Sequence, residues 1–300
     1  MKRPEYLKQG DKIAIISPSG KVERRYIEGA ERTLREWGLE PIIAMHCLSE
    51  CGRFAGKDEA RLQDLKEVLC NPSIRAVLCS RGGYGAIRLL EKIDTSWISD
   101  NPKWLIGYSD ISALHAIFRK AGVISLHAPM AKHLTDNSDN MPAIVMRDLL
   151  FGKWPVYRTK THPLNRFGKS EGTLFGGNLS VLFGLRGTPY DQISEGDILF
   201  IEDIAERPYH LERMMYNLKM SGILSKLSGF IVGKFTDYEE DLSIGKTVYE
   251  MMAEMVAPYD YPVCFDFPIG HVPMNFPIPE SAEAQLTVSE NGAVLKIISE

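Results

Sequence analysis

The sequence lacks an apolar run long enough to cross a membrane. The run that follows the basic N-terminus, residues 13–16, is too short for the core of a signal peptide. Cysteine is scarce as well, because five cysteines in a chain of 300 residues are an odd number and indicate no disulfide framework. Together these absences favour the cytoplasm as the compartment.

An excess of charge of one sign is also missing. The formal net charge is −4 and no long basic run stands out, so neither a nucleic acid nor an anionic membrane is expected as a partner. His46, Cys47 and Cys51 lie close together, but a structural zinc site needs four ligands and no second Cys/His pair follows at ligand spacing. The sequence therefore predicts no metal site.

The first half of the chain alternates short apolar runs with amphipathic segments. The apolar runs are rich in Ile and Val, as buried parallel strands are. The segments between them have helical spacing, and Ile27, Ala30, Leu34 and Trp37 recur about every 3.6 residues. This alternation predicts an α/β fold, with a doubly wound parallel sheet in an N-terminal domain over residues 1–155.

The second half has a different pattern. A polar stretch rich in Pro, Gly and basic residues predicts a linker over 156–171. The remainder, 172–300, is expected to form a smaller, β-rich α+β domain. It contains the predicted strands DILFIEDI, GFIVGKF and PVCFDFPIG, a helix that begins near Pro208, and a hairpin that turns at Asn291–Gly292.

In an open parallel sheet, functional groups gather where strands end and helices begin. The turn SPSG, residues 17–20, is explained as well by a tight turn as by a function. The stretch SRGGYGA, residues 80–86, offers the backbone N–H groups of Gly82 and Gly83 to a phosphate, a carboxylate or an oxyanion. It matches neither the dinucleotide fingerprint nor a P-loop, so it indicates an anion site more than a nucleotide site.

Ser109 lies at another strand end, between the strand WLIGY and the helix DISALHAIF. A Ser or an Asp here often caps the helix, and Asp110 can do so as easily as Ser109. A sharp strand-to-helix turn also presents a nucleophilic serine, with the next N–H aimed at the developing oxyanion. Ile111 stands where the G-x-S-x-G pattern has its second glycine. Local spacing therefore favours the cap and leaves the nucleophile open.

A nucleophilic serine needs a base, and the base needs an acceptor that orients it. Among seven histidines, His115 follows on the same helix and is expected to be a packed or surface residue. His271 lies in a Gly/Pro-rich loop after a strand, where a rigid scaffold would position a base. Glu202 and Asp203 end an apolar strand, and spacing does not decide whether a carboxylate there caps a helix or orients the base.

Eight stretches occur in an order and at a spacing that are highly specific: IAIISPSG, RFAGKDEARLQDL, SRGGYGAIRLL, LIGYSDISAL, HAPM, EGTLFGGNLSVLFGLRGTPY, ILFIEDIAERPYHLERMMYNLKMSGIL and IGHVPMNFPIP. Together they resemble the LD-carboxypeptidase family of serine peptidases, which includes the microcin-immunity peptidases. The resemblance extends over nearly the whole chain.

The resemblance implies a triad of Ser109, His271 and Glu202, with an oxyanion hole at the backbone N–H groups of Asp110 and Gly83. It implies a cytoplasmic, homodimeric serine carboxypeptidase that needs neither a metal nor an organic cofactor. Its substrate would be a muropeptide tetrapeptide that loses its terminal D-Ala during peptidoglycan recycling. The site would then lie between the two domains, since the first domain carries the serine and the second the other two residues.

Ala128 and the pair Glu280–Ser281 stand where the family usually has glycine. The pair follows His271 and puts the shape of the pocket and the choice of substrate in question. One alternative within the family is a microcin-immunity peptidase that cleaves a peptidyl-nucleotide. An alternative of another class is a non-catalytic two-domain protein whose glycine loops hold a carboxylate or phosphate.

Overall fold

The computed structural model describes residues 1–298, and this chain divides into two compact units. Unit 1 comprises Met1–Trp154 and Phe276–Ser281, and unit 2 comprises Pro155–Asn275 and the chain from Ala282 onward. No helix in the described part of the chain combines the length and the hydrophobicity needed to span a membrane.

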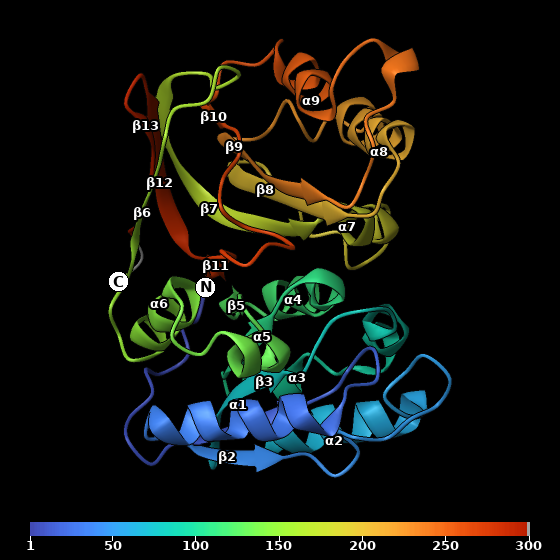
Figure 1. Ribbon diagram of the computed structural model, residues 1–300, viewed down its shortest axis with the longest axis vertical. Coiled ribbons are helices and arrows are strands. Elements are labelled where there is room, and N and C mark those ends of the chain that lie inside the picture. The colour runs from blue at the N-terminus through green and yellow to red at the C-terminus, as the bar shows by residue number, and fades with distance from the viewer. Residues whose placement is uncertain (299–300) are drawn as a thin grey trace. The chain divides into compact units, whose positions relative to one another are not determined.

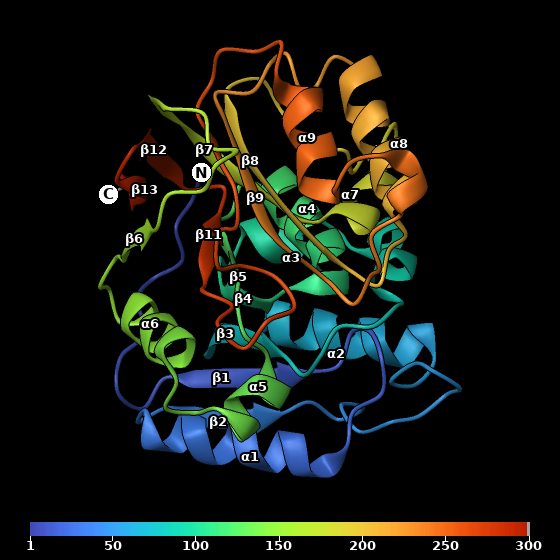
Figure 2. The same ribbon diagram turned by 45° about the horizontal axis from the view of Figure 1, so that its top comes forward.

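Unit 1 is built on a six-stranded sheet in the order β11-β5-β4-β3-β1-β2 (Figures 1 and 2). The five strands from β5 to β2 are parallel, and β11 is added antiparallel to β5. Their side chains form the core of the unit, and those of Ile13, Val77 and Ile106 are fully buried. The strands are β1 (Lys12–Ile16), β2 (Glu40–Ile43), β3 (Ile74–Cys79), β4 (Trp104–Gly107), β5 (Ser125–His127) and β11 (Ile278–Glu280).

Helices cover both faces of this sheet. Helix α1 packs against α5, whereas α2 packs against η1 and α3, and η1 packs against α4 (Figure 2). The doubly wound parallel sheet predicted for the N-terminal half is thus confirmed. The helices are α1 (Arg24–Glu36), α2 (Asp58–Cys70), η1 (Ala86–Lys92), α3 (Ser96–Ser99), η2 (Ser109–Ile111), α4 (Ser112–Lys120), α5 (Ala131–Asp136) and α6 (Met141–Leu150).

The strand order creates a switch point between β1 and β3. From β1 the chain passes to β2 on one side and then returns to β3 on the other, so the connections after β1 and β3 run in opposite directions along the sheet. These loops contact each other, since the Gly20 N–H donates a hydrogen bond to the Gly82 carbonyl at 3.3 Å. The end of β4, the next strand, carries Ser109, so three of the sequence-predicted turns meet at one edge of the sheet.

Unit 2 contains a seven-stranded sheet in the order β10-β9-β8-β7-β12-β13-β6. The strands from β10 to β7 are parallel and the remaining pairs are antiparallel. Helices α7, α8 and α9 lie together on one side of β7–β9 (Figures 1 and 2). The elements are β6 (Val156–Thr159), β7 (Gly168–Asn178), α7 (Leu179–Leu185), β8 (Asp197–Ile204), α8 (Pro208–Met220), β9 (Gly229–Thr236), η3 (Leu242–Ile244), α9 (Val248–Val256), β10 (Val263–Cys264), β12 (Glu283–Ser289) and β13 (Gly292–Ile297).

The predicted hairpin is confirmed, with Ser289 opposite Gly292. Two segments differ from the sequence-based expectation. The stretch 156–171, expected to be a linker, carries β6 and the first residues of β7. Strand β6 is largely exposed and pairs with β13, more than 130 residues later, so no local apolar pattern marks it. Likewise, β11 was expected in the second domain but completes the sheet of unit 1.

Candidate active site

Ser109 occupies a sharp turn between β4 and η2. Tyr108 is still extended, with φ −151° and ψ −172°, whereas Ser109 has a left-handed φ of 66°. A side chain at such a φ costs on the order of 1–2 kcal/mol, so most left-handed positions carry glycine. The residues at the N-cap positions of η2 and α4 are Tyr108 and Ile111, and neither makes a side-chain capping hydrogen bond. A left-handed residue between a strand and a helix is the backbone geometry in which a nucleophilic serine is presented.

Asp110 joins the Ser109 turn to the two glycine-containing loops. Its carboxylate is buried and accepts hydrogen bonds from the Ser19 hydroxyl at 2.6 Å and from the Ala86 N–H at 2.9 Å. Because the same carboxylate oxygen accepts both hydrogen bonds, Asp110 connects the loops after β1 and β3. The sequence had allowed Asp110 to cap its own helix. Its side chain instead bonds to Ser19 and Ala86.

The adjacent glycines Gly82 and Gly83 have different neighbours. A Cβ atom on Gly82 would lie 2.9 Å from the Ser109 Cβ and 3.0 Å from its Oγ, so only glycine fits there. The Gly82 carbonyl accepts from Gly20, and in a trans peptide the following N–H points the opposite way. The Gly83 N–H is therefore turned away from Gly20, and Gly83 itself has a φ of 121° that favours glycine.

The buried side chain of Arg61 also holds these loops, a role that sequence analysis missed. Its Nη1 donates hydrogen bonds to the Pro18 carbonyl and, at 3.0 Å, to the Gly85 carbonyl. Its Nη2 contacts Asp58 at 2.5 Å, so the buried charge is paired. The signal was present, because Arg61 lies in the stretch RFAGKDEARLQDL that contributes to the resemblance.

In unit 2, Glu202 and His271 form a hydrogen-bonded pair. Glu202 is fully buried near the end of β8, and its Oε2 accepts from the His271 Nδ1–H at 2.8 Å. Burial on its own would lower the pKa of His271, but the hydrogen bond to Glu202 and the charges of Glu202, Asp203 and Asp237 outweigh it and raise that pKa. With the proton on Nδ1, the neutral imidazole has its lone pair on Nε2, as a general base requires.

The structure separates the roles of Glu202 and Asp203, which the sequence left open. Asp203 accepts hydrogen bonds from the Asn178 side-chain amide at 2.9 Å and from the Ser180 N–H at 2.8 Å, so it fixes the start of α7. Burial raises the pKa of Asp203 to about 7, and the neighbouring Glu202 charge adds to the shift. Of the two carboxylates, Glu202 is the one that contacts His271.

The loop that carries His271 is fixed from both sides. The Gly270 N–H donates to the buried Oδ1 of Asn275 at 2.9 Å, and the Lys234 N–H donates to the Ile269 carbonyl at 2.8 Å. Gly270 has a φ of 121°, and a Cβ there would lie 3.0 Å from the Glu202 Cβ. The residue before His271 must therefore be small and left-handed, which explains the glycine.

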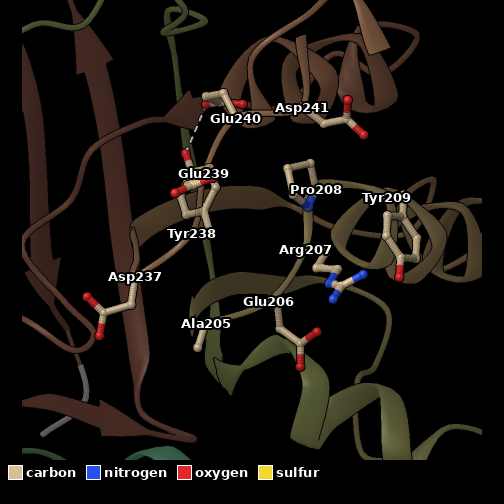
Figure 3. A pocket seen from close by; sticks show the side chains of 10 residues that line it. All are labelled: Ala205, Glu206, Arg207, Pro208, Tyr209, Asp237, Tyr238, Glu239, Glu240 and Asp241. Carbon is tan, nitrogen blue, oxygen red and sulfur yellow. Dashed lines mark hydrogen bonds between the residues drawn. The ribbon is translucent and has the colours of Figure 1, made fainter. Parts of the chain in front are cut away.

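A cavity of about 540 Å³ opens in unit 2 where β8 and β9 end (Figure 3). Asp237, which contributes to the raised pKa of His271, is part of its wall. Acidic side chains predominate, and Arg207 is the one Lys or Arg among the residues that line it. The lining residues are Ala205, Glu206, Arg207, Pro208, Tyr209, Asp237, Tyr238, Glu239, Glu240 and Asp241.

Other singled-out residues have structural roles. His115 is fully buried, with Ser125 Oγ at 2.7 Å and the Gly107 carbonyl at 2.8 Å, and burial lowers its pKa to about 4. His46 is paired with Asp64 at 2.8 Å, and among residues 1–298 no group of three metal-ligating side chains is arranged to hold an ion. Ser281, where the family usually has glycine, has a left-handed φ of 69°.

Known proteins share this architecture over the whole chain. Residues 13–128 match the LD-carboxypeptidase N-terminal domain, and residues 171–286 match the LD-carboxypeptidase C-terminal domain. The chain belongs to the LD-carboxypeptidase family and is therefore a carboxypeptidase.

Individual relatives agree with this assignment. The chain is 33% identical to the "Probable murein peptide carboxypeptidase" of Bacillus subtilis, covering 98% of this chain and 94% of that one. The crystal structure of muramoyltetrapeptide carboxypeptidase from Oxalobacter formigenes is similar with a TM-score of 0.87 and 30% identity, over 96% of this chain and 99% of the other. The microcin C7 self-immunity protein MccF of Escherichia coli is 29% identical over 87% of this chain and 86% of its own.

Proposed function

We propose that this protein is a serine LD-carboxypeptidase that removes the terminal D-Ala from a muropeptide tetrapeptide in peptidoglycan recycling. Ser109 is the nucleophile, His271 the general base and Glu202 the acceptor that orients it. The observation that carries the proposal is the conjunction of two features: a serine held in a left-handed strand-to-helix turn, and a buried carboxylate–histidine pair of the correct polarity.

The reaction follows from the roles of these groups. His271 Nε2 takes the proton from Ser109 Oγ as the oxygen attacks the carbonyl carbon of the scissile bond. The N–H groups of Asp110 and Gly83 donate to the oxyanion, and each such donor is typically worth about 3 kcal/mol in the transition state. His271 then gives its proton to the leaving D-Ala nitrogen, which leaves an acyl-enzyme. Water hydrolyses the ester by the same base, and Glu202 stabilises the imidazolium in both steps.

The proposed substrate follows from the names of the relatives. The relatives named for murein peptides and for muramoyltetrapeptide support a cell-wall peptide as substrate. The similarity to MccF keeps a peptidyl-nucleotide as the second candidate. The homodimer implied by the family resemblance is part of the proposal, and light scattering coupled to size-exclusion chromatography tests it.

The deciding experiment measures D-Ala release from L-Ala-D-Glu-meso-diaminopimelate-D-Ala. We expect release by the wild type, none from the isomer that ends in L-Ala, and loss of at least a thousandfold in Ser109→Ala. Ser96→Ala, in helix α3, is the matched serine control and should keep full activity. A Ser109→Ala enzyme with near-normal release would disprove the mechanism. No release by a folded wild type would redirect the assay to peptidyl-nucleotides.

A further inference from the structure

A second cavity, of about 330 Å³, lies within unit 1 next to the glycine loops. Cationic residues from three segments line it: Lys21 after the first loop, Arg81 in the second, and Lys132 at the start of α5. The remaining lining residues are Val22, Glu23, Tyr26 and Glu50. The cavity thus combines positive charge with an apolar wall made by a valine and a tyrosine ring.

Two of its cations are not neutralised by acidic side chains. Glu50 is paired with Lys21 at 2.8 Å, and Glu23 is paired with Arg25 at 2.9 Å. Within residues 1–298, neither Arg81 nor Lys132 has a carboxylate oxygen within 4.0 Å, and both side chains are exposed. These two residues therefore leave positive charge in the cavity that an anionic ligand could neutralise.

Arg81 belongs to the loop that contacts Ser109, and the backbone of Lys132 is hydrogen-bonded to the same loop. Arg81 immediately precedes Gly82, which packs against Ser109, and its Nη1 donates to the Lys21 carbonyl at 3.3 Å. Its Nη2 lies 4.0 Å from the Cβ position of Gly83, the candidate oxyanion donor. The Lys132 N–H donates to the Ser80 carbonyl at 3.2 Å, which ties the start of α5 to the same loop.

We propose that Arg81 and Lys132 bind the free carboxylate of the C-terminal D-residue that the reaction releases, and so restrict the enzyme to the end of a peptide. This inference rests on the proposed function. A planar guanidinium pairs with a carboxylate through two parallel hydrogen bonds, which gives direction as well as charge. The wall of Val22 and Tyr26 suits a small apolar side chain such as the methyl group of D-Ala.

The stem peptide contains other carboxylates, so the test must single out the terminal one. We compare the tetrapeptide acid with the same peptide ending in D-alaninamide, using the wild type, Arg81→Gln and Lys132→Gln. Arg32→Gln, on the exposed face of α1, is the matched arginine control. We expect the wild type to prefer the acid by about 10- to 100-fold in kcat/KM, as a charge-assisted contact would give. Arg81→Gln should lose most of this preference by slowing cleavage of the acid alone.

Each outcome bears on the inference. Equal cleavage of acid and amide by the wild type would overturn the carboxylate pocket while the proposed function stands. So would an Arg81→Gln enzyme that slows both substrates by the same factor, because that pattern indicates a general defect. If the wild type releases nothing, the proposed function fails separately. Calorimetric binding of the two peptides to Ser109→Ala then decides, since a preference for the acid that Arg81→Gln abolishes supports the pocket and no preference refutes it.

Discussion

The surroundings of Ser109 and those of His271 are built by different means. Around Ser109, unit 1 relies on backbone geometry: a left-handed serine and glycines that allow close approach. Around His271, unit 2 relies on side-chain charge, with a buried carboxylate and an imidazole whose pKa is raised. Substitutions around Ser109 should therefore lower activity when they add side-chain volume, and this effect should not depend on pH. Substitutions around His271 should lower activity when they change side-chain charge, and this effect should depend on pH.

The largest effect is expected from Glu202→Gln, which tests the charge-based region. The amide keeps the shape of the side chain but removes the carboxylate that holds the proton on His271 Nδ1, so kcat should fall about 10³- to 10⁴-fold near neutral pH. Stopped assays of D-Ala release measure it. Glu195→Gln, an exposed neighbour in sequence, is the control and should be silent. A loss of less than tenfold would mean that Glu202 does not orient the base.

Gly82→Ala tests the backbone-based region and should have the next largest effect. Its new Cβ would lie 2.9 Å from the Ser109 Cβ, so the nucleophile must shift, and a misplacement of this size costs on the order of 100-fold in kcat. The pH profile should keep its shape. Gly52→Ala is the control, since a Cβ atom on Gly52 would meet open space. Because Gly52 has a left-handed φ, the change should lose about 1 kcal/mol of stability and no activity. A changed shape of the pH profile in Gly82→Ala would contradict the distinction between the two regions.

Asp237→Asn should give the smallest effect, and one visible only as a function of pH. The base works when neutral, so the raised pKa of His271 should place the acid limb of kcat/KM above the usual value of about 6.5 for histidine. Removing the negative charge of Asp237 destabilises the imidazolium, lowers that pKa and moves the limb to lower pH. The titration of His271 by NMR provides a second measurement. Asp260→Asn, exposed in the same unit, should leave the limb in place, and an upward shift in Asp237→Asn would contradict the assignment.

The two regions also differ in how far the sequence could predict them. The strands and helices that position Ser109 could be predicted, because each has a local period and a turn at its end. The choice between Glu202 and Asp203 could not, because adjacent strand residues face opposite sides and only the fold shows which side carries His271. Arg61 was missed for a related reason, since its partners Pro18 and Gly85 are distant in sequence and both are backbone carbonyls.

The strand β11 has a consequence for how the chain reaches its folded state. Its residues, 278–280, come after almost all of unit 2 in the sequence, yet they form the edge of the sheet of unit 1 next to β5. During synthesis, β5 therefore presents an unpaired edge until the ribosome has made residues 278–280, and exposed edges invite wrong pairing. A gene fragment that stops at residue 154 would keep Ser109 and every glycine around it, and would still encode an incomplete sheet.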